Sequence, residues 1–386
     1  MQLDGESNME NKNGIATLYT GYNYGSALQA FAIKTVCSNL GYSSDIIKLR
    51  GLSKNRDIRI KKLVTILIKI IIHPTKYKTL KTYTKKSIPE NTKDKFTEFY
   101  TKRIAPKTFS YHQLRYLCKK QYYKFFLCGS DQIWNSATLY ADPFYYLRFI
   151  DKERRISFAP SFGRNYIAKN NLKKIMSYIN DIPHLSIREQ SGANLIEKYL
   201  HRTATVLIDP TLVLSKTEWG EALNVSAQTT GDYVLLYFLN EPTAETKKLI
   251  KKFRQTTGHQ SFAILNKFTD SSWYDAFIDA GPEEFLSLIM SAKHVFTDSF
   301  HGAVFSANFN TPFSVFPREY NGASNQSTRI TDFLRLIKAQ KRYDPTSIAE
   351  IQRPIDFESI NETLQRERKD SVQYLKRAIS EVKEYA

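Results

Sequence analysis

The segment TDSFHGA at residues 297–303 holds the residue types best suited to chemistry. It follows the apolar run 294–296 and opens an apolar, helix-like run that ends near residue 309. A strand–turn–helix junction presents free backbone N–H groups and the positive end of the helix dipole, which together suit an anion. His301 in that first turn could exchange a proton near neutral pH. The pattern predicts an anion site with a proton donor, although such a histidine can also make only a local hydrogen bond.

A second polar cluster, GSDQIWN at residues 129–135, follows the apolar run 125–128. Asp131 could accept a proton from a hydroxyl group. The amides could bond sugar hydroxyls while the Trp134 ring covers the C–H face of a sugar. The alternative is a helix N-cap formed by Ser130 or Asp131, with Trp134 in the core.

Two further strand ends carry arginine. Arg188 lies where an apolar strand meets a helix, and it could grip a carboxylate or phosphate through two parallel hydrogen bonds. Its alternative is an ion pair with Glu189 or another acid. Arg164 follows the small residues of SFG at 161–163. The glycine turn TGYNYGS at 20–26 lacks the GxGxxG spacing, so it gives little support to a dinucleotide site.

Strands and helices alternate along the chain, which is typical of parallel α/β sheets. Ligands of such sheets bind beyond the carboxyl ends of the strands, where each of these motifs falls. We expect two doubly wound, Rossmann-like domains facing across a cleft. The expected ranges are a flexible lead-in at 1–13, a first domain at 14–208 with a basic helical insertion at about 54–107, a second domain at 209–345, and a C-terminal helix within 346–386 that packs back on the first domain.

The composition bounds the class of protein. The chain has 386 residues, 42% of them hydrophobic, and a net charge of +18, which indicates a packed globular protein with a strong basic excess. Residues 48–107 hold eighteen Lys/Arg and four Asp/Glu, so most of the excess lies in one segment. Three cysteines without CxxC spacing favour a reducing compartment and no structural metal. The polar N-terminus does not resemble a signal peptide.

Within the basic segment, residues 59–72 predict an amphipathic helix. Lys61, Lys62, Thr65 and Lys69 share one side, and Leu63, Val64, Leu67, Ile68 and Ile71 share the other. Such a helix can lie in the interface of an anionic membrane. The alternative is a surface helix that packs its apolar stripe on the core, which is the commoner arrangement. No nucleic-acid-binding module is recognisable, so nucleic acid is not an expected partner.

Six segments, in order, resemble the bacterial polysaccharide pyruvyl transferases: GYNYGS at 21–26, GSDQIWN at 129–135, SFG at 161–163, SIRE at 186–189, DPT at 209–211 and DSFHG at 298–302. The resemblance implies a GT-B-like pair of Rossmann domains. It also implies that phosphoenolpyruvate donates pyruvate to a pair of sugar hydroxyls, as a cyclic ketal, with no further cofactor and no metal. The acceptor would be a sugar or a lipid-linked oligosaccharide used in surface-polysaccharide synthesis, which places the protein in the cytoplasm or at the inner membrane face.

The resemblance also implies roles for single residues. Arg188 matches a donor-binding arginine and His301 a histidine often assigned as general acid, and we add Asp131 as the base. Some members carry an arginine where this chain has Ser299, so one cation needs a replacement. The candidates for that cation are Arg164, Lys267, Arg318 and Arg329. The residues predicted to bind the donor, here called the donor set, are Ser299, Phe300, Gly302, Arg164 and Arg318. The acceptor set is Asn23, Tyr24, Gly25, Ser130, Gln132, Trp134 and Asn135.

Two other functions remain compatible with the sequence. A glycosyltransferase on the same architecture would use a nucleotide sugar and would bind a nucleoside diphosphate rather than phosphoenolpyruvate. A non-catalytic relative would bind carbohydrate without turnover. The histidine, arginine and aspartate at strand ends favour an enzyme, because a binding module has less need of that arrangement.

Overall fold

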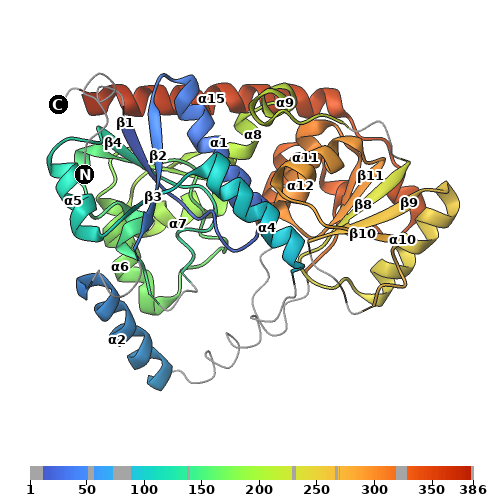
Figure 1. The fold of residues 1–386 in the computed structure, drawn as a ribbon, viewed down its shortest axis with the longest axis horizontal. Helices are drawn as coiled ribbons and strands as arrows, with labels where there is room; N and C mark the ends of the chain where they lie inside the picture. Colours follow the sequence, from blue (N-terminus) through green and yellow to red (C-terminus); the bar gives the residue numbers. More distant parts are fainter. Residues whose placement is uncertain are drawn as a thin grey trace.

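Two five-stranded parallel sheets organise the chain, one in each half (Figure 1). The computed structural model describes residues 12–50, 56–72, 88–136, 140–227, 232–265, 268, 270–318 and 328–383. The first sheet has the order β3-β2-β1-β4-β5 and the second the order β10-β9-β8-β11-β12. Both orders place the first strand of the unit at the centre, as in a Rossmann fold. The sequence prediction of two Rossmann-like units is confirmed.

The strands are short and their pairs are parallel. The first sheet holds β1 (Lys12–Ala16), β2 (Ser43–Leu49), β3 (Lys107–Phe109), β4 (Phe125–Cys128) and β5 (Arg155–Ser157), and the second holds β8 (Tyr233–Tyr237), β9 (Gln260–Ile264), β10 (Ala276–Ile278), β11 (His294–Thr297) and β12 (Phe313–Val315). A small two-stranded sheet pairs β6 (Ser186–Ile187) with β7 (Thr205–Val206).

Helices cover the sheets and connect the strands. In the first half they are α1 (Tyr24–Asn39), α2 (Arg56–Ile72), α4 (Glu90–Phe99) with a π-helical extension at Tyr100–Ile104, α5 (Tyr111–Lys119), α6 (Lys169–Asn180) and α7 (Gln190–Leu200). In the rest of the chain they are α8 (Pro210–Val213), α9 (Lys216–Leu223), α10 (Ala244–Thr257), α11 (Pro282–Ser291), α12 (Phe300–Phe309), α13 (Thr328–Leu336), α14 (Ile348–Ile351) and α15 (Phe357–Lys383). Short 3-10 turns occur at Pro143–Tyr146, Lys152–Arg154 and Gln340–Arg342.

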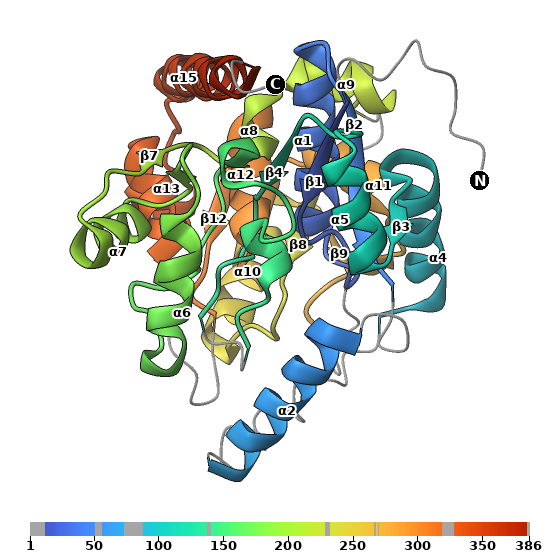
Figure 2. The same ribbon diagram turned by 90° about the vertical axis from the view of Figure 1, so that its left-hand side faces the viewer.

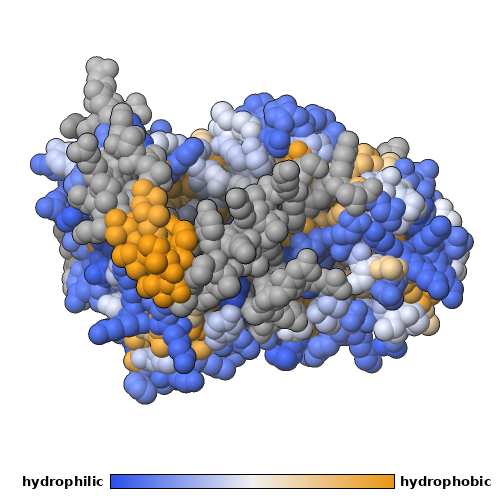
Figure 3. Space-filling view, turned by 90° about the horizontal axis from the view of Figure 1, so that it is seen from below, coloured by the Kyte–Doolittle hydropathy of each residue, from blue (hydrophilic) through white to orange (hydrophobic). Residues whose placement is uncertain are grey.

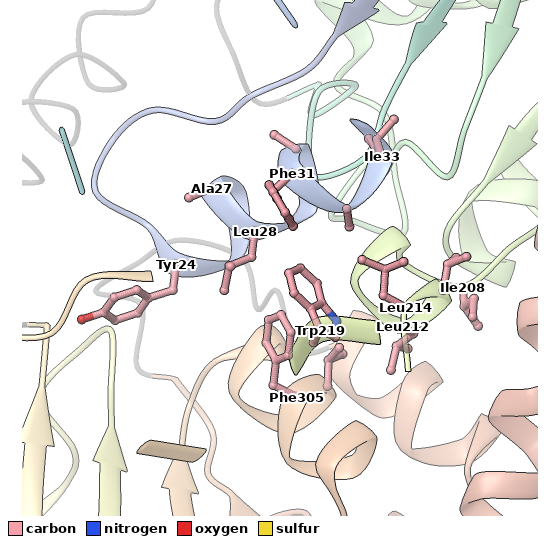
Figure 4. Close-up of a cluster of buried hydrophobic side chains, with 14 of the residues drawn as sticks. Tyr24, Ala27, Leu28, Phe31, Ile33, Ile208, Leu212, Leu214, Trp219 and Phe305 are labelled. Atoms are coloured by element: carbon pink, nitrogen blue, oxygen red, sulfur yellow. The ribbon is translucent and has the colours of Figure 1, made fainter. Parts of the chain in front are cut away.

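One hydrophobic cluster joins the two halves. Phe31 of α1 lies against the ring of Trp219 on α9, with 5.8 Å between ring centroids, and Trp219 in turn meets Phe305 of α12 at 5.4 Å. Figure 4 shows these side chains turned toward one another from three separate elements. Tyr24 extends the same cluster, because its ring stacks on Phe285 of α11 at 4.3 Å. This packing fixes the start of α1 relative to the second sheet.

The helix α15 lies along both halves rather than on the first alone (Figure 1). Its Tyr374 hydroxyl donates to the Ser157 carbonyl at the end of β5, and its Arg368 guanidinium donates to the Asn308 side chain of α12. The prediction that the C-terminal helix packs on the first domain is therefore incomplete, because α15 contacts both halves. Such a helix restricts relative movement of the two sheets.

The basic segment is described only in part. The helix α2 forms as predicted, but its apolar stripe does not pack on the core, since Leu63, Leu67 and Ile71 are exposed. The core-packing interpretation was therefore wrong. None of the helices in the described ranges combines the length and apolar character that crossing a bilayer requires. Of the proposed lead-in at 1–13, residues 1–11 lie outside the described residues, as does Lys267. Lys12 and Asn13 belong to β1, so the lead-in was predicted two residues too long.

Candidate active site

The turn between β11 and α12 is anchored by Asp298. Its carboxylate accepts hydrogen bonds from the backbone N–H groups of Leu239 (2.7 Å) and Asn240 (3.1 Å), which follow β8. The same carboxylate pairs with the Arg318 guanidinium, whose Nε lies 3.0 Å from Asp298 Oδ2. These contacts bind the ends of β8, β11 and β12 together. They hold the first turn of α12 in place at the junction of the two halves.

His301 stands in that first turn and is buried against α1. An ideal Cβ built on Gly25 would lie 1.9 Å from His301 Nδ1, so the imidazole occupies the space that any other residue would need at position 25. On its other side, His301 Nε2 lies 3.7 Å from Asp209 Oδ2. His301 therefore joins the glycine turn of the first half to the second half of the chain.

A buried ion pair continues the site from His301. The Arg188 guanidinium, just beyond β6, donates a hydrogen bond to Asp209 Oδ2. Asp209 Oδ2 also accepts from Ser130 Oγ at 3.2 Å, while Oδ1 accepts from the backbone N–H and hydroxyl of Thr211. Burial alone would raise the pKa of Asp209, but Arg188 and then His301 outweigh burial and hold that pKa far below its usual range. Asp209 is therefore an ionised carboxylate that lies between the Arg188 guanidinium and the His301 imidazole.

Arg188 has further donors that this ion pair does not use. Its buried Nε and Nη2 groups make no hydrogen bond within the described residues. Buried donors of this kind are costly without a partner, so their presence beside a histidine favours an anionic ligand. The guanidinium carbon lies 4.6 Å from the centroid of the Phe300 ring, and that of Arg329 lies 5.5 Å from the same centroid. Two arginines thus meet one aromatic side chain.

Arg329 adds positive charge to the cluster. Burial, and then repulsion by Arg188, lowers the pKa of Arg329 to about 10, so Arg329 stays protonated at neutral pH. Of the four candidates for the replacement cation, Arg329 shares the Phe300 ring with Arg188. Arg318 pairs with Asp298, and Arg164 lies over the Tyr166 ring at 5.6 Å instead. The placement of Arg164 does not support its predicted role in the donor set.

Asp131 brings a second carboxylate to the cluster. Ser26 Oγ on α1 donates to Asp131 Oδ2 at 2.6 Å. Burial raises the pKa of Asp131, but Arg188, His301 and the Ser26 hydrogen bond together bring it below its usual range. Its backbone adopts a left-handed φ of 55°, an uncommon conformation for a non-glycine residue that often marks functional sites. Asp131 is ionised at neutral pH and lies on the turn that follows β4.

The structure assigns structural contacts to several predicted acceptor residues. Trp134 is fully buried, stacks on Tyr146 and donates from Nε1 to the Tyr145 carbonyl, so its face is not available to a sugar. Tyr24 is also fully buried and donates to the Ala280 carbonyl across the two halves. The prediction of sugar contacts by these two rings was wrong, because both rings fill the core.

The remaining acceptor residues lie on the turns themselves. Asn23 caps α1 by accepting from the Ser26 N–H at 3.1 Å, and Ser130 is buried against Gln29 and Asp209. The Asn135 amide donates to Gln132 Oε1 at 2.7 Å. Asn23, Gln132 and Asn135 are only half-buried, so they remain candidates for acceptor contact.

The motifs SFG and SIRE meet through Glu189. This buried carboxylate accepts from the backbone N–H groups of Phe162 (2.8 Å) and Gly163 (3.4 Å). Burial raises the pKa of Glu189 above its usual range. In the donor set, Ser299 is the N-cap residue of α12, and Gly302 packs so closely on Thr297 that an added Cβ would lie 2.4 Å from the threonine hydroxyl. Both therefore shape the turn that carries His301.

Asp209 is the functional candidate that motif reasoning passed over. Its DPT segment carried part of the family resemblance, yet no role followed from the residues alone. A signal was present, because an aspartate before proline at a strand end is a common helix N-cap. That signal does not reveal the ion pair with Arg188, since the two residues meet only in the folded chain. Within the described ranges, no group of three or more His, Cys, Asp and Glu side chains is arranged to hold a metal ion.

A family model described as polysaccharide pyruvyl transferase matches residues 23–320, well over half of the chain. This chain belongs to the polysaccharide pyruvyl transferase family. The matched range contains Gly25, Asp131, Arg188, Asp209 and His301, whereas Arg329 lies beyond its end. No curated protein sequence matches the chain.

Two solved structures are similar to this chain at low sequence identity. UGT89C1 of Arabidopsis thaliana, complexed with UDP-L-rhamnose, is 9% identical, with 96% of this chain and 98% of that chain covered and a TM-score of 0.52. The UDP-GlcNAc 2-epimerase of Methanocaldococcus jannaschii is 9% identical, with 92% of each chain covered and a TM-score of 0.48. At this identity the likeness to UGT89C1 concerns the fold alone, and it agrees with a GT-B-like pair of Rossmann units in this pyruvyl transferase family member.

Proposed function

We propose that this chain transfers pyruvate from phosphoenolpyruvate to a pair of sugar hydroxyls, forming a cyclic ketal. The observation that carries the proposal is the cluster in which Asp209 contacts both Arg188 and His301, with Asp131 and Arg329 beside it. It combines cationic groups, a proton donor and a carboxylate base at the junction of two Rossmann-like units. Pyruvyl transfer from phosphoenolpyruvate requires groups of these three kinds.

The donor carries a carboxylate and a phosphate, so its site needs several fixed positive charges. Arg188 supplies two donor nitrogens, Nε and Nη2, that its ion pair leaves unused, and Arg329 supplies the second cation. Asp209 neutralises part of the charge of Arg188 and holds the guanidinium in one orientation. The backbone N–H groups at the start of α12 add to the same positive field.

Proton transfer follows from the position of His301. Protonation of the methylene carbon of phosphoenolpyruvate by His301 makes the adjacent carbon electrophilic. An acceptor hydroxyl gives its proton to Asp131 and forms a C–O bond to that carbon. The second hydroxyl then attacks the same carbon while the bond to the phosphate oxygen breaks. Inorganic phosphate leaves with that electron pair and takes up the proton of the second hydroxyl. Return of the first hydroxyl's proton from Asp131 to His301 restores both groups. The products are the cyclic ketal and phosphate, and no oxidant or reductant is consumed.

The biological setting is part of the same proposal. The acceptor would be a repeat unit of a surface polysaccharide, carried on a lipid at the inner face of the membrane. The protein would then work in the cytoplasm, at or near that surface.

Phosphate release tests the proposal directly. The purified chain, phosphoenolpyruvate and a panel of sugar and lipid-linked oligosaccharide acceptors should yield inorganic phosphate. His301→Ala should lower the rate about 100-fold or more, as expected for loss of a general acid. Arg188→Lys keeps the charge but loses the planar fork, and it should mainly weaken phosphoenolpyruvate binding, measured by calorimetry.

Tyr116→Ala, at an exposed position on α5, is the control and should behave as the parent chain. Circular dichroism and thermal unfolding would confirm that each variant is folded. Full activity of both site variants would refute the assignment. Calorimetric binding of a nucleoside diphosphate, with none of phosphoenolpyruvate, would support the glycosyltransferase alternative instead.

A further inference from the structure

The helix α2 exposes an aliphatic face to solvent. It projects from the first half, away from both sheets (Figure 2). Leu63, Val64, Leu67, Ile68, Ile71 and Ile72 are 44% to 78% exposed. Seen from the side on which α2 projects, they form a compact hydrophobic area (Figure 3). Isolated exposed apolar residues are ordinary, but a contiguous patch of large aliphatic side chains usually marks a surface that meets another apolar phase.

Between residues 63 and 72, α2 turns most of its apolar side chains outward, unlike an ordinary surface helix. Among residues 63–72, the part of α2 whose side chains the structure describes, Thr65, Ile66, Lys69 and Ile70 are half-buried, so a lysine lies on the side that faces the protein. Lys69 Nζ donates to Asn171 Oδ1 on α6 at 3.1 Å. A surface helix in water normally turns its apolar stripe inward and its charges outward. Here a polar contact joins the inward side of the helix to α6, and the aliphatic face points outward.

Charge indicates which partner this face suits. The sequence of α2 holds five Lys/Arg and one Asp, and residues 63–72 contain no acidic residue. A second copy of the chain, docked symmetrically, would bring the same basic helix against itself, and the like charges would repel. An anionic lipid surface instead attracts the basic residues while its acyl region accepts the aliphatic face. The 17-residue helix suits a position in the membrane interface.

We propose that α2 is a membrane-docking helix that inserts Leu63, Leu67 and Ile71, with their aliphatic neighbours, into the interface of an anionic bilayer. This goes beyond pyruvyl transfer and does not depend on it, because the helix lies apart from the His301 cluster. Vesicle binding without substrate therefore tests docking alone, and phosphate release tests the chemistry alone.

The experiment is co-sedimentation of the full chain with vesicles of phosphatidylcholine, with and without one-third phosphatidylglycerol. We expect binding to the anionic vesicles, and an affinity about tenfold or more weaker for the neutral ones. The double substitution Leu67→Glu/Ile71→Glu should weaken binding to anionic vesicles by at least about tenfold. The matched control is Tyr116→Glu/Val206→Glu, which adds the same two charges at exposed apolar positions elsewhere and should retain binding.

Three results would overturn the proposal. The first is no binding to anionic vesicles, and the second is equal binding to both vesicle types. The third is a wild-type dimer in light scattering that Leu67→Glu/Ile71→Glu converts to a monomer, which would make this face an interface between copies. All four positions are exposed, so the thermal unfolding midpoint should be unchanged and a folding defect would be visible separately.

Discussion

At the scale of single residues, Asp209 organises the candidate site. One of its oxygens faces Arg188, His301 and Ser130 together, and the other holds the Thr211 backbone and hydroxyl. Removing one member of a buried ion pair leaves the other charge uncompensated, which typically costs 3–5 kcal/mol. The carboxylate therefore fixes the arginine that is proposed to bind the donor, and it limits the positions open to the imidazole.

Arg329 is predicted to bind the donor beside Arg188. Arg329→Ala should raise the KM for phosphoenolpyruvate about tenfold or more while lowering kcat less, because a charge contact to the donor is lost and the proton donor remains. Steady-state kinetics and calorimetry would measure both effects. Arg335→Ala is the matched control on the same helix, since Arg335 is exposed and pairs with Asp332 at 3.0 Å. Unchanged donor affinity in Arg329→Ala would remove Arg329 from the site.

The buried His294 should make the free energy of unfolding depend on pH. Its ring nitrogen Nε2 lies 3.0 Å from Ser314 Oγ, and burial followed by the nearby Arg342 lowers its pKa to about 3. The ordinary histidine pKa is about 6.5. Between about pH 3 and pH 6.5, His294 is therefore protonated in the unfolded chain but neutral in the folded chain. Stability should therefore fall as the pH drops below about 6.5, by about 1.4 kcal/mol per pH unit from this group.

Denaturant unfolding at pH 7.5 and pH 5 would measure this effect. The parent chain should lose about 2 kcal/mol more than His294→Gln over that interval, because glutamine does not titrate. The comparison between the two proteins cancels the other titrating groups. Equal losses in both would show that His294 does not cause the acid sensitivity.

At the scale of elements, the sequence predicted the helices and strands whose ends are marked by a clear local pattern. The strand β11 and the helix α12 were expected within one residue of their ends, because an apolar run, a polar turn and a second apolar run differ clearly in pattern. The short α9 was missed even though Ser215 and Glu218 form a capping box, and the three-residue β3 is too short to show a pattern. Trp134 was misassigned because packing, not composition, decides whether an aromatic ring faces solvent.

The most important contact of the site could not be predicted from pattern at all. Gly25 and His301 are far apart in the sequence and meet only because α1 packs on α11 and α12. The glycine turn suggested close approach to a ligand, whereas the structure shows close approach to a catalytic candidate. Periodicity describes one element at a time, so it carries no information about such a contact between elements.

Substitutions at two glycines of the same turn can distinguish displacement of the His301 imidazole from backbone strain. Gly25→Ala should displace the imidazole of His301 and lower kcat about 100-fold, since the added Cβ would overlap Nδ1. Gly21 has a φ of 95°, and no atom lies within 4 Å of a Cβ built there. Gly21→Ala should cost about 1–2 kcal/mol of stability and keep the activity. Equal activity loss in the two variants would place the cause in the turn rather than at His301.

At the scale of the whole molecule, the hydrophobic core does not divide at the domain boundary. The largest cluster contains Ile15 of β1, Val295 of β11 and Leu375 of α15, so it takes in both sheets and the C-terminal helix. Each half also has a smaller cluster of its own. Separate Rossmann domains joined by a linker could unfold independently, but a shared core opposes independent unfolding.

The three tryptophans can test this coupling. Trp134 lies in the cluster of the first half and Trp273 in that of the second, while Trp219 lies in the shared core. Replacing two of the three with phenylalanine gives one chain that reports on Trp134 and another that reports on Trp273. In each chain, fluorescence should follow the same denaturation curve as far-ultraviolet circular dichroism, because both halves unfold together.

Tyr374→Ala supplies the perturbation for the same measurement. Tyr374 is buried on α15 and donates to the Ser157 carbonyl of the first half, so its loss should cost about 3 kcal/mol. A shared core requires that this substitution move the Trp134 and Trp273 transitions by the same amount, although only Trp134 belongs to the half that Tyr374 bonds. A shift confined to the Trp134 signal would show two independent units, and the fixed distance between Gly25 and His301 would then need another explanation.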